Sequence, residues 1–264
     1  MKRVAVLLYG VVAYLIFFST FLYLIGFVGN LLVPKALDGP LEVSWGVAAL
    51  VNVLLILLFG LQHSIMARPA FKDWWTKIVP KPIERSTFVL FTCACLITMF
   101  TFWQPMGGAV WVVESAFWKG VLYATFGLGW VVVLASTFLI NHFDLFGLRQ
   151  VWLHFRGKPY TQMRFRTPLL YKHVRHPLYL GFLMAFWAAP VMTVTHLFFA
   201  IGLTAYILTA IRLEERDLIQ HFGEKYRSYR QAVPMLFPTL FRKKEKQLSY
   251  LTIMQGLRDE GKRP

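Results

Sequence analysis

The sequence predicts an all-α fold: a polytopic membrane helical bundle with four spans, followed by a helix–turn–helix hairpin. Of the 264 residues, 57% are hydrophobic and 16% are charged, whereas soluble domains carry about a quarter charged residues. The mean hydropathy is +0.52, and the apolar residues stand in long runs between polar links. A soluble protein with an unusually apolar core does not account for runs of this length.

Four apolar runs are long enough to cross a bilayer as helices. A hydrocarbon core of about 30 Å requires roughly 20 helical residues. Proline, glycine and charged residues fill the links between the runs, which predicts where the helices end. The expected spans cover residues 4–33, 43–66, 87–103 and 119–140.

A fifth apolar stretch, residues 178–211, is too long for one comfortable span. Pro190 interrupts it, and proline breaks a helix because it lacks the backbone donor and clashes with the preceding turn. We therefore expect a hairpin. Its first arm, 178–189, is too short to cross the bilayer, and we expect it to re-enter beside its neighbours.

The net charge of +15 lies in the polar links, chiefly 67–86, 141–177 and the segment after residue 212. Lys and Arg beside apolar spans are typical of cytoplasmic segments that lie against anionic lipid. We therefore expect an integral protein of a bacterial inner membrane, with both termini in the cytoplasm. Membrane lipid is an expected partner, and nucleic acid is not.

Two polar clusters flank the hairpin. Because the hairpin reverses the direction of the chain, we expect both clusters at the same cytoplasmic end of the bundle. Carboxylates of the protein can bind an amine of a ligand, and a His/Arg group can bind its carboxylate. A zwitterionic, aromatic ligand therefore matches the two clusters. The residues are Arg175, His176 and Tyr179 before the hairpin, and Glu214, Glu215 and Tyr226 after it.

One of the two adjacent glutamates should face the ligand, because neighbouring helical residues point about 100° apart. We prefer Glu215 over Glu214 for this role. The alternative interpretation of the clusters is structural: His176 caps a helix that begins at Pro177, the glutamates pair with arginines, and the tyrosines lie at the membrane interface.

The clusters lie in the segments RHPLYLG and EERDLIQHFGEKYRSYRQAVPMLFP. In this order, across a hairpin, the segments resemble the isoprenylcysteine carboxyl methyltransferase and phospholipid methyltransferase superfamily over residues 171–238. The resemblance implies a membrane methyltransferase that binds S-adenosylmethionine (SAM) through the six residues named above. The implied organisation is a membrane bundle over 1–140, a SAM-binding region over 141–238 and a basic cytoplasmic tail over 239–264.

The stretch NHFDLFGLRQ, residues 141–150, is not part of the general pattern of that superfamily. With the layout of the whole chain, it resembles the methanethiol S-methyltransferase branch and also the related NnrU-like proteins. The first resemblance implies methylation of a small thiol, methanethiol, to dimethyl sulfide. The alternatives are a lipid or isoprenylcysteine carboxyl methyltransferase and a non-enzymatic NnrU-like accessory protein.

The same stretch supplies the candidate catalytic residues His142, Asp144 and Arg149. The attacking species must be a thiolate, because a thiol is a poor nucleophile. His142 is a candidate base, oriented by Asp144, and Arg149 is a candidate cation beside the developing thiolate. The structural alternative is an ion pair that anchors the loop, since Asp144 is the only acid within 141–177.

We expect no metal ion. Cys93 and Cys95 lie two positions apart inside an apolar run, where they point to different faces of a helix. The sequence contains no Cys/His cluster with the spacing of a zinc site, and direct methyl transfer requires no metal.

Overall fold

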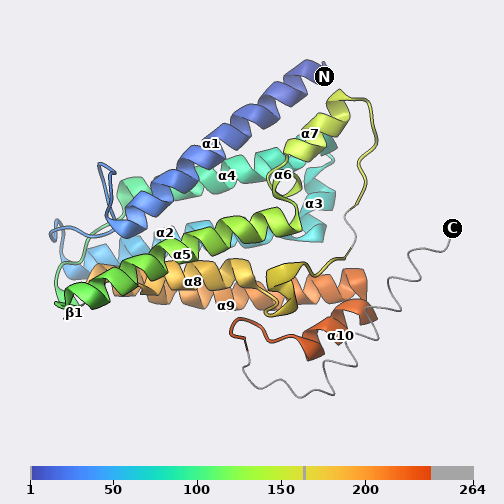
Figure 1. Cartoon of the computed structure of the whole chain (residues 1–264). Helices are drawn as coiled ribbons and strands as arrows, with labels where there is room; N and C mark the ends of the chain where they lie inside the picture. The colour runs from blue at the N-terminus through green and yellow to red at the C-terminus, as the bar shows by residue number, and fades with distance from the viewer. Residues whose placement is uncertain (1, 163–164, 239–264) are drawn as a thin grey trace.

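The computed structural model describes residues 2–162 and 165–238. Within them, long helices lie along one another in an elongated bundle (Figure 1). Five helices are long and apolar enough to cross a membrane, which agrees with the predicted polytopic helical class. They are α1 (Arg3–Gly29), α2 (Trp45–Ala67), α4 (Lys81–Phe102), α5 (Ala116–Ile140) and α9 (Val194–Phe222).

Shorter elements complete the fold: α8 packs inside the bundle, and the others lie toward its two ends. The polar segment 141–177 contains helical pieces, and two short strands form a ribbon that the sequence did not predict. These elements are α3 (Pro69–Trp75), α6 (His142–Leu145), α7 (Leu148–Phe155), η1 (Leu169–Lys172), α8 (Pro177–Trp187) and α10 (Glu224–Ala232), with the strands β1 (Ala109–Val112) and β2 (Val191–Thr193).

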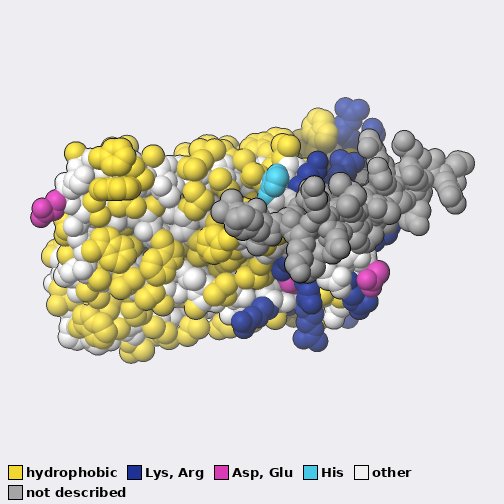
Figure 2. Space-filling model, turned by 60° about the horizontal axis from the view of Figure 1, so that its bottom comes forward, with side chains coloured by type: hydrophobic (Ala, Val, Ile, Leu, Met, Phe, Trp, Pro, Cys, Tyr) yellow, Lys and Arg dark blue, Asp and Glu magenta, His cyan; other side chains and the backbone are white. Residues whose placement is uncertain are grey.

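The polar elements gather at one end, which we call the basic end: α3, α6, α7, α10 and the start of α1 (Figure 1). Figure 2 shows Lys and Arg side chains grouped there, while hydrophobic side chains cover most of the remaining face. A band of apolar surface with a cationic border is typical of a bilayer-embedded helical protein. The expected tail, 239–264, lies outside the described residues.

The first arm of the hairpin differs from its expected re-entry. α8 has 11 residues, a length of about 16 Å at 1.5 Å per residue, so the helix alone does not cross the bundle. The chain continues to the opposite end as an extended segment that includes β2, which pairs with β1 antiparallel. The backbone of Val113 donates to Pro190 O at 2.9 Å, so the segment that follows the helix break is held in the ribbon.

α8 is fixed against α5 by two glycines that meet face to face. A Cβ on Gly129 would lie 2.7 Å from the carbonyl oxygen of Gly181, and one on Gly181 would lie 2.6 Å from that of Gly129. Small residues let helices approach closely in membrane proteins. This contact sets the depth of α8 and therefore the position of His176 at its N-terminus.

The apolar core runs through both halves of the chain. It includes buried aromatic residues of α1, of the α4 C-terminal end, of α5, of α8 and of α9. Because these side chains pack closely, the helices have little freedom to slide past one another. The rigid bundle therefore supports the side chains at the basic end. The aromatic members are Phe27, Phe100, Trp103, Phe126, Trp130, Phe186 and Phe199.

Candidate active site

Glu215 joins three segments at the basic end, and its residue is 8% exposed. Its Oε1 lies 2.7 Å from Nε of Arg175 and 3.0 Å from Nε2 of His176. Its Oε2 lies 3.8 Å from Nη1 of Arg230. The carboxylate on α9 is therefore held by residues at the start of α8, which are largely buried, and by Arg230 of α10, whose side chain is 50% exposed.

Backbone hydrogen bonds bring the two sequence segments together. The amide of Arg175 donates to Pro234 O at 2.9 Å, and that of His176 donates to Met235 O at 3.1 Å. The guanidinium of Arg175 also donates to the carbonyls of Arg230, at 2.9 Å, and Val233. The chain after α10 thus lies beside the start of α8, so the predicted pairing of the two clusters across the hairpin has a backbone basis.

Glu214 has a different environment from Glu215. Its side chain is 42% exposed, and Oε2 accepts a hydrogen bond from the Tyr179 hydroxyl at 3.0 Å. Nδ1 of His176 lies 4.0 Å from the same oxygen. The other oxygen, Oε1, has no hydrogen-bond partner among residues 2–162 and 165–238. Glu214 is therefore the carboxylate that can accept a cationic ligand.

This arrangement reverses our preference within the glutamate pair. Sequence reasoning favoured Glu215 as the ligand-facing residue, but its charge is used by Arg175 and His176. The two side chains diverge around α9, as adjacent helical residues must. The docking of α8 and α10 buries Glu215 and leaves Glu214 partly exposed.

Tyrosine side chains lie near Glu214 and Glu215. The pKa of Tyr171 is raised by burial and by the charge of Glu214, so its hydroxyl stays protonated as a donor. Tyr226 is 2% exposed, and its pKa is raised by burial and by the charges of Glu215 and Glu214. Tyr226 packs against Tyr229 and Phe165, which places it behind Glu215 as part of the support for α10.

His142 lies at the same end, between α1 and α5. It is 3% exposed, its ring stacks on Phe138 with centroids 4.2 Å apart, and burial lowers its pKa. The Thr137 hydroxyl donates to Leu134 O at 2.7 Å, so it accepts from His142 Nδ1 at 2.9 Å. Nε2 is then left to accept from the Tyr14 hydroxyl at 2.8 Å. Both ring nitrogens of His142 are thus occupied by protein groups.

Asp144 does not orient His142, contrary to expectation. Its carboxylate accepts from Arg149 Nη1 at 2.9 Å and from the Tyr160 hydroxyl at 3.2 Å. The same Arg149 nitrogen donates to Thr161 O at 2.9 Å. The reason is local: α6 is a single turn, capped by the Asn141 side chain, and the chain after α7 returns past Asp144. This geometry favours the loop-anchoring ion pair over a catalytic dyad.

Sequence reasoning missed three arginines at the basic end. Arg230 completes the Glu215 network. Arg68, at the end of α2, pairs with Asp217 on α9 at 2.6 Å, and Arg85 donates to Leu145 O at 2.6 Å. All three stand in segments recognised as basic, but nothing in their spacing indicates a partner far away in the sequence.

An apolar hollow of about 670 Å³ lies beside the cluster, between the end of α5 and the segment 169–173. Phe138 forms part of its wall and stacks on His142, while Tyr171, next to the wall, lies near Glu214. The hollow therefore lies next to Phe138, the ring that stacks on His142. Its lining residues are Ala135, Phe138, Leu139, Leu169, Leu170 and His173.

Comparison with known proteins identifies a family and several relatives. A family model described as protein of unknown function (DUF1295) matches residues 67–233, which include both polar clusters and residues 141–150. A methanethiol S-methyltransferase of Crocosphaera subtropica is 52% identical, over 92% of this chain and 95% of its own length. Methanethiol S-methyltransferase 1 of Bradyrhizobium diazoefficiens is 55% identical, over 88% of this chain and 81% of its own.

A more distant relative is Nurim of Xenopus laevis, 30% identical over 70% of each chain. No solved structure matches the chain significantly.

Proposed function

Because the chain belongs to the methanethiol S-methyltransferases, and through residues 67–233 to the DUF1295 family, we propose that it is a membrane enzyme that methylates methanethiol to dimethyl sulfide with SAM as methyl donor. The structural observation that carries the proposal is the open carboxylate oxygen of Glu214 beside His176 and Tyr179. We place the basic end in the cytoplasm, following its Lys and Arg content, and membrane lipid around the spans.

The residues present fit SAM. This donor supplies an electrophilic methyl group on a sulfonium, together with an ammonium and a carboxylate. Glu214 offers a half-exposed anion for a cationic group, and Tyr179 fixes the direction of that anion through a 3.0 Å hydrogen bond. Arg175, His176 and Glu215 fix the start of α8, the helix that carries Tyr179. We therefore assign these three residues the role of positioning Tyr179.

The acceptor must lose its thiol proton before its sulfur attacks, because the thiolate is the nucleophile. An apolar surrounding favours reaction of a desolvated thiolate with a cation, since charge is neutralised as the new S–C bond forms. The hollow beside Phe138 offers such a surrounding and a route for an apolar acceptor from the lipid. A longer acceptor, a lipid or a prenyl-cysteine, is the second candidate, because the hollow is larger than a one-carbon thiol requires.

Purified protein should release dimethyl sulfide from methanethiol and SAM, measured in the headspace. Each added methylene in an apolar site changes binding by only about 1–3 kcal/mol, so activity should change by stages from methanethiol to ethanethiol to propanethiol. Protein that binds SAM but produces no dimethyl sulfide would exclude the thiol assignment. Faster turnover of a phosphatidylethanolamine or prenyl-cysteine substrate would favour the second candidate.

His142 tests whether the 141–150 stretch acts in chemistry or in structure. We expect His142→Ala to lower stability by about 1–3 kcal/mol, because Tyr14 and Thr137 lose their buried partner. The folded pKa of His142 lies below its ordinary value of 6.5. The unfolded chain therefore takes up the proton first, and wild-type stability falls as the pH drops below 6.5 through the lowered pKa. The His142→Ala variant should lack this pH-dependent loss of stability.

Thermal unfolding in detergent between about pH 5 and pH 8 measures this effect. His221→Ala, which removes an exposed histidine near the end of α9, is the control. Unchanged stability combined with a turnover deficit that shrinks as pH rises would instead make His142 the base, because solvent can then supply the thiolate.

A further inference from the structure

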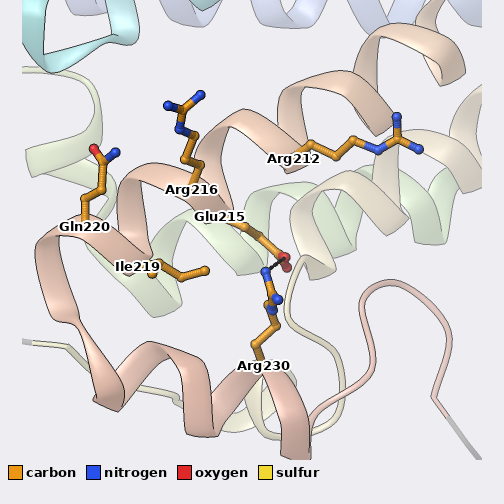
Figure 3. A pocket seen from close by; sticks show the side chains of 6 residues that line it. All are labelled: Arg212, Glu215, Arg216, Ile219, Gln220 and Arg230. Carbon is orange, nitrogen blue, oxygen red and sulfur yellow. Dashed lines mark ion pairs between the residues drawn. The ribbon is translucent and has the colours of Figure 1, made fainter.

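A polar hollow of about 420 Å³ lies between α9 and α10, and Glu215 of the proposed SAM-binding cluster forms part of its wall. Figure 3 shows its side chains: several project from successive turns of α9, and Arg230 reaches from α10 toward Glu215. Small-molecule sites commonly have volumes of roughly 300–1,000 Å³, so the hollow can receive a ligand group. It is lined by Arg212, Glu215, Arg216, Ile219, Gln220 and Arg230.

The hollow carries excess positive charge. Its single acid, Glu215, is already paired with Arg175 and His176 outside the hollow. Neither Arg212 nor Arg216 has an ion-pair partner among the residues that the structure describes. Arg230 pairs with Glu215, whereas the exposed side chains of Arg212 and Arg216 border the hollow and diverge from each other (Figure 3). The unbalanced charge of these two arginines favours an anion. Guanidinium binds phosphate oxygens in a bidentate manner.

The position of the arginines indicates where that anion comes from. The exposed face of α9 carries Ile201, Ala205 and Leu208 within the apolar part of the helix. Arg212 and Arg216 follow Leu208 at intervals of four residues, on the same face, about 6 Å apart along the axis. An acyl chain against the apolar stripe would thus end with its headgroup at the two arginines. Basic recesses beside membrane helices bind anionic headgroups in this way.

We propose that this hollow binds the phosphate of an anionic phospholipid, with Arg212 and Arg216 as the main contacts. Glu214 does not line the hollow, and the proposal does not depend on the proposed methyl transfer. Lipid bound there would link α9 to the membrane surface at the level where the Glu215 network begins.

Native mass spectrometry of the full-length protein in detergent tests the proposal. Phosphatidylglycerol is titrated against phosphatidylcholine with the same acyl chains. Wild-type protein should bind phosphatidylglycerol at least tenfold more tightly. The double variant Arg212→Gln/Arg216→Gln should lose roughly five- to thirtyfold in affinity for it, since each cation near the surface contributes about a factor of five.

A matched control removes two exposed arginines elsewhere, Arg156→Gln/Arg227→Gln, and should retain phosphatidylglycerol. Gln220→Glu places an acid in the hollow without removing an arginine, and should weaken binding even if the double variant fails to fold. Equal binding of the two lipids by wild-type protein, or equal loss in the control, would overturn the proposal. Displacement of phosphatidylglycerol by millimolar inorganic phosphate would assign the site to a soluble phosphate instead.

Discussion

Glu215→Ala is expected to destabilise the protein by about 3–5 kcal/mol, the usual cost of leaving a buried charge without its partner. The side chains of Glu215 and Arg175 are each 10% exposed, so water cannot replace the lost carboxylate. His176 and Arg230 lose the same partner. We expect α10 and the start of α8 to separate from α9, and SAM binding to fail as a consequence.

The measurement is chemical or thermal unfolding in detergent, with Glu214→Ala as the neighbouring control. Because the Glu214 side chain is 42% exposed and holds one tyrosine, its loss should change stability by under about 1 kcal/mol. Glu215→Gln, which keeps the shape and one acceptor oxygen, should recover part of the stability. A Glu215→Ala protein as stable as wild type, yet unable to bind SAM, would return Glu215 to the role of direct ligand.

Glu214→Ala is expected to weaken SAM binding by roughly 10- to 150-fold while the protein stays folded. The variant removes the open oxygen that would contact a cationic group, and a hydrogen bond to a charged group contributes about 1.5–3 kcal/mol. Tyr179→Phe should give a smaller loss, since it removes only the group that orients the carboxylate. Isothermal titration calorimetry with SAM measures both.

Glu224→Ala is the matched control, because Glu224 is an exposed carboxylate on α10 that pairs with Arg227. It should leave SAM affinity unchanged. Unaltered SAM affinity in Glu214→Ala would remove Glu214 from the donor site. An equal loss in Glu214→Ala and Glu224→Ala would show that net charge, and not the position of the carboxylate, governs binding.

The sequence determined the polytopic helical class and which two polar segments meet. Span length follows from bilayer thickness and helical rise, so α1, α2, α4 and α5 could be predicted from apolar runs alone. Pro190 predicted the break between the two arms of the hairpin. The order of the two polar segments predicted that His176 and the glutamate pair meet, and they do, through Glu215.

The tertiary structure decided every long-range pairing. Glu214 and Glu215 are equivalent by composition, and only the docking of α8 and α10 separates the open carboxylate from the buried one. Asp144 stands near His142 in the sequence but pairs with Arg149 and Tyr160, because a one-turn helix and a returning chain set its direction. Local propensity and spacing fix which face of a helix a side chain occupies, whereas the partner on that face depends on packing between elements far apart in the sequence.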